Sequence, residues 1–389
     1  MKMKAKKVIA YGCCSLLLAV VLGFFLLPRY LQRVILYGNP GIEDQHIFEN
    51  RRIQAGSPQP WPLAAHYNQG RINVAQMHYF DSLETVAFLV VQDSAIIYEN
   101  YWQHYHNQTI SNSFSVAKSI VALLAGIARD EGYIQSFEQK VAEFYPPFAA
   151  DARANIRIKD VLNMSAGLDW DESYSSPFSP TAKAYYGNNL EGLVQAMQAV
   201  EAPGQRYRYQ SGLTQLLAFV VANAVGQDIS SYASEKLWLP LGAEQDALWS
   251  LDKKDGVEKA YCCFYASARD FARIGQLVLQ QGLWKGVPLV SQAFLEEATH
   301  PVPGVKNGDS EREADFYGYQ WWRLTYKGME VKYARGIGGQ YIFVIPHKNM
   351  VIVRLGHKRS TTRDAQGIPM DIGVWLDTAF DITLQAREF

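Results

Sequence analysis

The order of strand-like and helix-like segments limits the folds that this chain can adopt. Residues 85–102 alternate apolar and polar positions on either side of a short polar turn, which predicts a β-hairpin. Residues 115–295 are largely helical in pattern, with breaks at prolines. Four strands are then expected within residues 319–355, at 319–324, 330–333, 340–345 and 350–355, and a final helix over 370–385. Strands at both ends with helices between them can form one antiparallel sheet that carries a helical insertion.

Length and charge narrow the class of protein further. The chain has 389 residues, of which 48% are hydrophobic, so it can bury a large core as one catalytic-sized domain or as two closely joined ones. Its net charge is −1, and it carries no basic patch and no recognisable nucleic-acid-binding module. A nucleic-acid partner is therefore not expected.

The amino end carries a targeting signal. Four lysines within the first seven residues precede residues 8–27, a run of 20 residues without a charge, which is long enough to span a bilayer. Two arginines follow, and because more positive charge precedes the run than follows it, the amino end is expected in the cytoplasm. The sequence predicts an uncleaved inner-membrane anchor over residues 1–28, with the rest of the chain on the periplasmic or other extracytoplasmic side. A cleaved signal peptide is the alternative.

The rest of the chain divides into a connector and a main domain. Residues 29–75 contain several prolines and little periodicity, which indicates a membrane-proximal connector with a short ordered lead-in. Residues 76–389 are expected to form the main domain, with its helical part at about 120–300.

Cysteine and histidine spacing indicates no metal site and no other cofactor. The four cysteines form two adjacent pairs, Cys13 with Cys14 and Cys262 with Cys263, and no Cys-x-x-Cys pattern is present. Four free thiols are expected, with a bond between Cys262 and Cys263 as the alternative.

Ser115 and Lys118 carry the chemistry that the sequence shows best. They are three residues apart, nearly one helical turn, at the start of a long apolar run, so both side chains lie on one face of a buried helix. A lysine whose pKa is lowered by burial can take the proton of a neighbouring hydroxyl and make it a nucleophile. The alternative is a serine that caps the helix and a lysine whose head reaches water. Ser250 and Lys253 repeat the spacing, but in a polar stretch where water would keep the lysine protonated.

Two later segments favour the catalytic interpretation. Tyr209 and Ser211 lie in a turn that leads into an apolar helix, where they can bring a phenol and a hydroxyl to a reaction centre. Gly336 to Gly339 open an apolar strand, and such small residues let a substrate approach the backbone N–H groups. Packing or turn formation explains each segment alone, but three such segments in one order are a stronger signal.

In this order the segments resemble the serine β-lactamase and penicillin-binding protein superfamily. Within it, they are most similar to the branch of esterases, D-aminopeptidases and 6-aminohexanoate-dimer (nylon oligomer) hydrolases. Residues 158–174 and 266–275 resemble two further motifs of that branch, and the likeness extends over roughly residues 45–385. It implies a β-lactamase/transpeptidase-like fold, which is α/β of the α+β type. In this fold helices flank an antiparallel sheet and also form a helical insertion. The N-terminal transmembrane helix would come in addition.

The resemblance also implies a reaction and residue roles. It implies a serine hydrolase that cleaves an ester or amide bond of a small molecule or short peptide through an acyl-enzyme on Ser115, with Lys118 as base and Tyr209 as proton relay. The oxyanion would be held by backbone N–H groups of Ser115 and of the Gly338-Gly339 segment. The residues expected to contact the substrate are Tyr174, Ser211 and Ile337.

Two departures from the superfamily pattern bear on the substrate. Serine stands at position 211 where the lactamases have asparagine, and Gly336 stands where their strand motif has lysine. Arg335 lies one residue earlier and is expected to point to the opposite face of the strand. These departures disfavour the alternative activity, that of a β-lactamase or D,D-peptidase acting on β-lactams or peptidoglycan. A non-catalytic binding relative is the other alternative.

Overall fold

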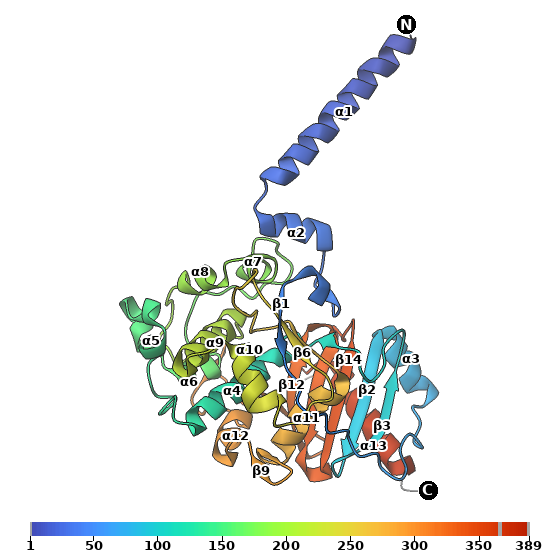
Figure 1. Ribbon diagram of the computed structural model, residues 1–389, viewed down its shortest axis with the longest axis vertical. Helices are drawn as coiled ribbons and strands as arrows, with labels where there is room; N and C mark the ends of the chain where they lie inside the picture. Colours follow the sequence, from blue (N-terminus) through green and yellow to red (C-terminus); the bar gives the residue numbers. More distant parts are fainter. Residues whose placement is uncertain (1, 365–367, 387–389) are drawn as a thin grey trace.

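The core of the molecule is a six-stranded antiparallel sheet. The computed structural model describes residues 2–364 and 368–386, and its large sheet has the strand order β11-β12-β13-β14-β2-β3 (Figure 1). The strands are β2 (Thr85–Gln92), β3 (Ala95–Tyr101), β11 (Trp322–Tyr326), β12 (Met329–Gly336), β13 (Gln340–Ile345) and β14 (Met350–Gly356). The predicted hairpin is confirmed as β2 and β3, and the carboxyl-terminal strands return beside it, as the sequence pattern requires.

One predicted strand begins later than expected. The apolar pattern indicated a strand over residues 319–324, but β11 starts at Trp322. The backbone N–H groups of Tyr319 and Gln320 bond instead to the carbonyl oxygens of Ala298 and Leu162 in the helical region. Residues 319–321 therefore join the sheet to the helices rather than extending a strand.

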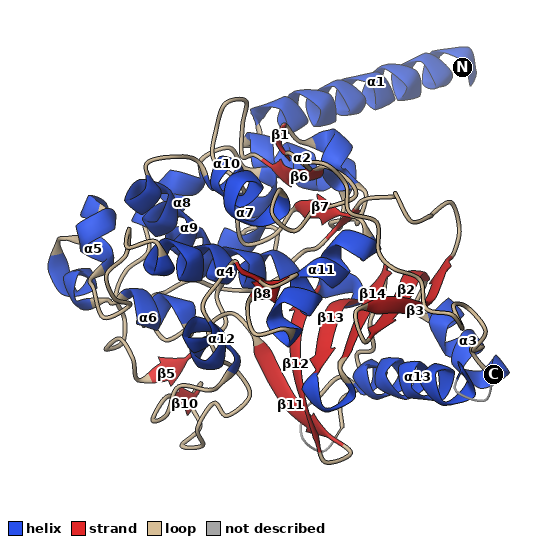
Figure 2. Cartoon of the chain, turned by 60° about the horizontal axis from the view of Figure 1, so that its bottom comes forward, coloured by secondary structure: helices blue, strands red, loops and turns tan. Residues whose placement is uncertain are grey.

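Helices cover both faces of the large sheet (Figure 2). On one face, α3 (Val74–Ser82) and α13 (Met370–Ala386) enclose an aromatic core in which the rings of Phe80 and Trp375 are 4.6 Å apart. On the other face lies α11 (Ala268–Leu279). A Cβ at Gly275 would lie 2.5 Å from a methyl group of Val351, so glycine is what allows α11 to pack directly on β14.

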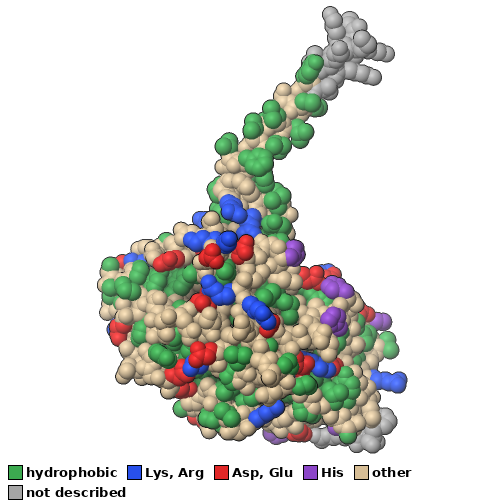
Figure 3. All heavy atoms as spheres, in the orientation of Figure 1, with side chains coloured by type: hydrophobic (Ala, Val, Ile, Leu, Met, Phe, Trp, Pro, Cys, Tyr) green, Lys and Arg blue, Asp and Glu red, His purple; other side chains and the backbone are tan. Residues whose placement is uncertain are grey.

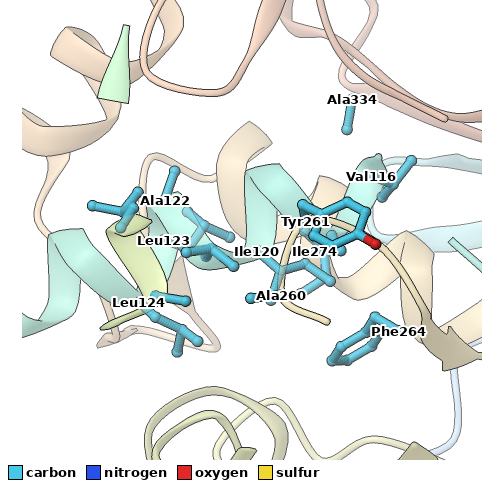
Figure 4. Packing of buried hydrophobic residues seen from close by; sticks show 14 of the residues in the cluster. Val116, Ile120, Ala122, Leu123, Leu124, Ala260, Tyr261, Phe264, Ile274 and Ala334 are labelled. Atoms are coloured by element: carbon cyan, nitrogen blue, oxygen red, sulfur yellow. The ribbon is translucent and has the colours of Figure 1, made fainter. Parts of the chain in front are cut away.

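The helical region extends beyond one end of the sheet. Its helices are α4 (Val116–Asp130), α5 (Val141–Phe144), α6 (Ile158–Leu162), α7 (Pro180–Tyr186), α8 (Leu190–Gln195), α9 (Ser211–Val225), α10 (Ile229–Ala233) and α12 (Gln292–Thr299). Ile120 and Leu123 of α4 pack near Ala260 and Ile274 at the centre of this region (Figure 4). Because α4 is apolar on nearly all sides, it is enclosed by the other helices and by the sheet.

Part of the predicted connector is built into the body of the molecule. A four-stranded sheet has the order β1-β6-β7-β4, formed by β1 (Asn50–Ile53), β6 (Ala247–Ser250), β7 (Phe264–Ala266) and β4 (Ser111–Asn112). Before it, α2 (Arg29–Tyr37) packs against α7. Residues 29–53 therefore have a defined structure although their sequence shows little periodicity. Contacts with distant segments of the chain stabilise them.

The amino-terminal helix α1 (Lys2–Leu26) projects away from the body (Figure 1). Of the helices that the structure describes, none alone combines the length and the hydropathy of a membrane span. Cys13–Leu26 and Arg29–Tyr37 meet that test only as a pair, with a bend of 119° between them. The membrane anchor predicted over residues 8–27 thus stays a prediction.

Candidate active site

Ser115 and Lys118 are brought together at the amino end of α4. The Lys118 Nζ donates hydrogen bonds to Ser115 Oγ at 3.1 Å, to Ser211 Oγ at 3.0 Å and to the carbonyl oxygen of Tyr261 at 2.9 Å. In the part of the chain that the structure describes, the Ser115 side chain forms no helix-capping bond, and Lys118 is only 1% exposed. The alternative of a capping serine with a lysine that reaches water is therefore wrong.

The backbone before α4 positions the serine hydroxyl. Phe114 has a φ of 43°, so the chain turns sharply between β4 and α4. The Asn112 side-chain oxygen fixes this turn by accepting hydrogen bonds from the backbone N–H groups of Phe114, at 2.9 Å, and Cys263, at 3.1 Å. The turn places Ser115 at the first residue before the helix, one turn from the amine.

The surroundings of Lys118 favour the loss of its proton. Burial lowers the pKa of the Lys118 ammonium to about 8, and the negative charge of Glu172 opposes that shift. The amine nitrogen lies 5.1 Å from the centre of the Tyr209 ring and 5.5 Å from that of Tyr261, and these ring faces, unlike burial, favour the charged amine. A lysine with such a pKa is partly neutral near neutral pH, which is what a general base for a hydroxyl requires.

Tyr209 lies next to the same two groups. Its ring packs at 5.6 Å from Trp322 and 6.2 Å from Tyr317, which fixes its orientation. Burial raises the pKa of the Tyr209 phenol well above its ordinary value, while a hydrogen bond with Ser115 acts in the opposite direction. The phenol therefore keeps its proton at neutral pH and can donate it.

Glu172 completes the polar network, and we did not predict it from the sequence. Its carboxylate accepts hydrogen bonds from Ser211 N–H and Oγ, both at 2.6 Å, from Trp170 Nε1 at 2.9 Å and from the Tyr174 hydroxyl at 2.5 Å. It reaches Lys118 through the Ser211 hydroxyl. In the sequence, Glu172 stands between Trp170 and Tyr174, which is the one feature that sets it apart. That spacing alone does not show where the carboxylate points.

The glycine-rich segment approaches Ser115 at its first residues. A Cβ at Gly336 would lie 2.4 Å from the carbonyl oxygen of Ser113, so the end of β12 runs directly against the backbone before Ser115. Ile337 lines the same cavity as Ser115. The Gly338 and Gly339 carbonyl oxygens instead accept hydrogen bonds from a distant arginine, each at 2.9 Å. Ile337 thus lies on the wall of the serine cavity, and the N–H groups of Gly338 and Gly339 as oxyanion donors stay a prediction.

The cavity at Ser115 has a volume of about 370 Å³ and a mainly apolar lining. The predicted substrate contacts Tyr174, Ser211 and Ile337 all lie on its wall. The wall also includes residues of the amino-terminal segment and of α7, namely Val34, Gly38, Asn39, Pro40, Thr181 and Tyr185. Such a lining suits the apolar part of a small-molecule substrate.

A second cavity, of about 780 Å³, lies on the side of Tyr209 where Arg335 is found. The Arg335 guanidinium lies 3.9 Å from the centre of the Trp322 ring, and both residues line this cavity with Tyr209. Arg335 thus lines the cavity beside Tyr209 and is not among the residues that line the cavity at Ser115.

Cys262 and Cys263 form a disulfide bond, so the expectation of four free thiols is wrong for this pair. Both residues are buried, and Cys263 has a φ of 60°. The bonded pair directly follows Tyr261, whose carbonyl oxygen accepts a hydrogen bond from Lys118, and Cys262 lines the cavity at Ser115.

We expect that breaking this disulfide lowers kcat, because the turn that it closes holds one of the three acceptors of Lys118. Cys262→Ser with Cys263→Ser should lower kcat on a p-nitrophenyl ester by about fivefold to tenfold, equivalent to a loss of about 1 kcal/mol in positioning. A dithiol reductant should shift the wild-type kcat toward that of the double variant and leave the variant unchanged. A wild-type kcat that does not change while the thiols become titratable would contradict this expectation.

Among residues 2–364 and 368–386, no three His, Cys, Asp or Glu side chains gather in a way that could hold a metal ion.

Comparison with known proteins agrees with this geometry. The sequence profile of the Beta-lactamase family matches residues 76–373. A 6-aminohexanoate-dimer hydrolase of Paenarthrobacter ureafaciens is 28% identical over 288 residues, which cover 70% of this chain and 72% of that protein. A candidate 6-aminohexanoate-dimer hydrolase from Bacillus anthracis has a similar structure, with a TM-score of 0.73, 19% identity and coverage of 90% of this chain and 94% of that one. A family VIII carboxylesterase has a TM-score of 0.60 at 16% identity, covering 83% of this chain and 99% of that one.

Proposed function

Because the chain belongs to the beta-lactamase family, a family of serine hydrolases, we propose that it cleaves an ester or linear amide bond by acyl transfer to Ser115. The observation that carries this proposal is the buried amine of Lys118 at 3.1 Å from the Ser115 hydroxyl. A hydroxyl is a weak nucleophile at neutral pH unless a neighbouring base removes its proton.

The first half of the proposed reaction forms the acyl-enzyme. Lys118 takes the proton of Ser115 as Oγ bonds to the substrate carbonyl carbon. Tyr209 donates its proton to the leaving group as the ester or amide bond breaks, and it recovers a proton from Lys118. In the second half, water attacks the acyl carbon, its proton returns through the same groups, and the bond to Ser115 breaks.

The negative oxygen of the intermediate needs hydrogen-bond donors. The backbone N–H of Ser115 lies at the amino end of α4, where the helix dipole favours an anion. A second donor would come from the segment of residues 337–339, and the position of Ile337 on the wall of the serine cavity supports this. One such donor contributes roughly 3 to 4 kcal/mol to lowering the barrier.

Glu172 would stabilise the protonated form of Lys118. When Lys118 carries the serine proton, the Ser211 hydroxyl and the Glu172 carboxylate behind it stabilise the ammonium charge. We therefore assign Glu172 and Ser211 as positioning residues for Lys118.

A small linear amide or ester fits better than a β-lactam. The relative of 28% identity is named for the 6-aminohexanoate dimer, which is a linear amide. Gly336 stands where the lactamase strand motif has lysine, so the cation that binds a carboxylate there is absent from that position. A β-lactamase or D,D-peptidase activity is the second candidate, and turnover of nitrocefin by the purified protein would favour it.

The pH dependence of ester hydrolysis tests the proposed base. Only the neutral amine can accept the serine proton, so kcat/KM for p-nitrophenyl butyrate should rise with pH and level off above an apparent pKa of about 8. The rate of the Ser115→Ala variant at each pH gives the background to subtract. A kcat/KM that stays flat between about pH 6 and about pH 9 would contradict Lys118 as the base.

The amino-terminal helix is part of the proposal. We propose that α1 anchors the protein in the inner membrane and that the catalytic body lies on the extracytoplasmic side. Exposed apolar side chains cover the described part of α1, including Leu16, Leu18, Leu22 and Leu26. Positive charge is greater before the apolar run of residues 8–27 than after it, which favours a cytoplasmic amino end.

A further inference from the structure

We propose that the cavity at Ser115 opens toward the membrane surface, and that its substrates are amphiphilic esters or amides held in a bilayer that contains anionic lipids. This inference rests on the proposed acyl-transfer function and names the class of substrate that the same site would take.

The first observation is that the segment after α1 forms one wall of the cavity. Val34 of α2 and residues 38–40 line it together with Ser115. The Tyr186 hydroxyl of α7 donates a hydrogen bond to the Gly38 carbonyl oxygen at 2.7 Å, and its ring stacks on Tyr37 at 6.5 Å. The wall is thus fixed to the body of the enzyme, and an entrance on this side would lie beside the helix that follows α1.

The second observation is that apolar side chains are exposed on the elements around this entrance. Ile35 and Leu36 of α2 are 61% and 64% exposed, and Phe178, in the loop that borders the cavity, is 66% exposed. Exposed apolar groups that gather around a binding site indicate a surface that something covers. The apolar side chains of α1 continue from this surface, so one lipid phase would cover both.

The direction of α2 agrees with that arrangement. The bend of 119° between the two helices is closer to a right angle than to a straight continuation. If α1 crosses the bilayer, α2 therefore lies near the plane of the membrane surface, where an amphipathic helix inserts its apolar side chains between the lipid headgroups. The cavity wall formed by α2 would then lie at the depth of the headgroups.

The third observation is positive charge on the same side of the molecule. A cavity of about 430 Å³ next to α2 is lined by Arg29, Arg33, Lys253 and Lys254, together with the acidic residues Glu49 and Asp252. The Asp252 carboxylate accepts hydrogen bonds from the backbone N–H groups of Leu190 and Val257, which offset part of its negative charge. Figure 3 shows Lys and Arg side chains gathered where α1 meets the body. Such cations complement the phosphates of anionic lipids.

These observations together define the substrate. The acyl or alkyl part would enter the apolar cavity at Ser115 from the headgroup region, and the polar part would stay near the cations beside α2. A substrate that partitions into the bilayer reaches the cavity without crossing bulk water, so its local concentration at the entrance is raised.

The test uses the full-length protein reconstituted into phosphatidylcholine vesicles with and without phosphatidylglycerol. p-Nitrophenyl palmitate in the vesicles is the amphiphilic probe, and p-nitrophenyl acetate in the buffer is the soluble one. We expect Ile35→Glu to lower the rate on the palmitate by about tenfold and to leave the rate on the acetate unchanged. Lys253→Glu combined with Lys254→Glu should remove the acceleration by phosphatidylglycerol.

The matched control is Leu384→Glu on α13, where the side chain is also 61% exposed but lies at the opposite end of the molecule from α2. It should leave both rates unchanged. This inference would be overturned if Ile35→Glu and Leu384→Glu changed the rate on the palmitate equally. It would also be overturned if that rate changed neither on addition of vesicles nor on substitution of Ile35. In both cases, hydrolysis of the acetate would still support the proposed function. Failure of the wild type on both esters would overturn the proposed function itself.

Discussion

Replacing Ser115 with alanine is expected to lower kcat on a p-nitrophenyl ester by roughly 10⁴-fold or more, and to abolish covalent labelling by a fluorophosphonate probe. The Ser115 Oγ is the hydroxyl that the buried Lys118 amine contacts at 3.1 Å, and it lies at a helix amino end where an oxyanion can be held. Without Oγ no acyl-enzyme can form, and the other groups of the site can only assist attack by water. Burst kinetics and mass spectrometry of the labelled protein measure both effects.

Ser250→Ala is the matched control, because Ser250 and Lys253 have the same Ser-x-x-Lys spacing. The Ser250 hydroxyl is buried and donates a hydrogen bond to the Asn50 side chain at 2.8 Å, whereas Lys253 is exposed. This variant should lose about 1 kcal/mol of stability and keep its labelling and kcat. Labelling that persists in Ser115→Ala, or that is lost in Ser250→Ala, would refute the assignment of the nucleophile.

Replacing Lys118 with methionine is expected to lower kcat by roughly 10³-fold or more while it makes the fold more stable at neutral pH. The activity falls because Ser115 loses the base that removes its proton. The stability rises because the native state no longer has to bury a charged or easily charged amine, and methionine fills a similar volume with apolar atoms.

The pH dependence of that stability difference has a definite sign. The pKa of Lys118 falls from 10.5 to about 8 on folding, so between these two values the unfolded chain binds more protons than the native state. The wild type therefore gains stability as pH rises through this window, and the burial penalty is fully present below pH 8. At pH 7 Lys118→Met should be more stable than the wild type by about 1 to 3 kcal/mol, and the difference should narrow above pH 8. Thermal unfolding of the full-length protein at several pH values measures this.

Lys259→Met is the control for the effect of removing a buried lysine. Lys259 is also fully buried, and burial lowers its pKa to about 7, but its amine donates to the carbonyl oxygens of Ala184 and Gly187 rather than to Ser115. This variant should show a pH-dependent change of stability and keep most of its kcat. If both lysine variants lost activity equally, Lys118 would have no role beyond structure.

Much of the fold follows from local patterns in the sequence. The apolar residues of β2 and β3 on either side of a polar turn, and the long apolar run of α4, identify these elements, although β2 is buried along its whole length. The start of β11 could not be placed in the same way. Residues 319–321, with two aromatic side chains, look like the start of a strand, but backbone hydrogen bonds to the helical region hold them outside the sheet.

The candidate site was predictable to the extent that its groups are close in the sequence. Ser115 and Lys118 share one helical turn, so their contact is local. Tyr209 joins them from the loop that precedes α9, and its role was suggested only by the order of motifs that the family shares. Glu172 escaped prediction because nothing within its own segment shows that its carboxylate meets Ser211.

The sequence by itself determined the kind of chemistry: a hydroxyl and an amine one helical turn apart in apolar surroundings, followed by a phenol and a glycine-rich strand. Tertiary structure alone decided which groups surround that pair. It put Glu172 behind Ser211, Ile337 on the wall of the serine cavity, and the segment after α1 into that same wall. The physical reason is the distance along the chain over which each effect acts. Helical and strand periodicities act over a few residues and can be read along the chain, whereas burial, pKa shifts and cavity walls arise from segments that meet only when the whole chain has packed.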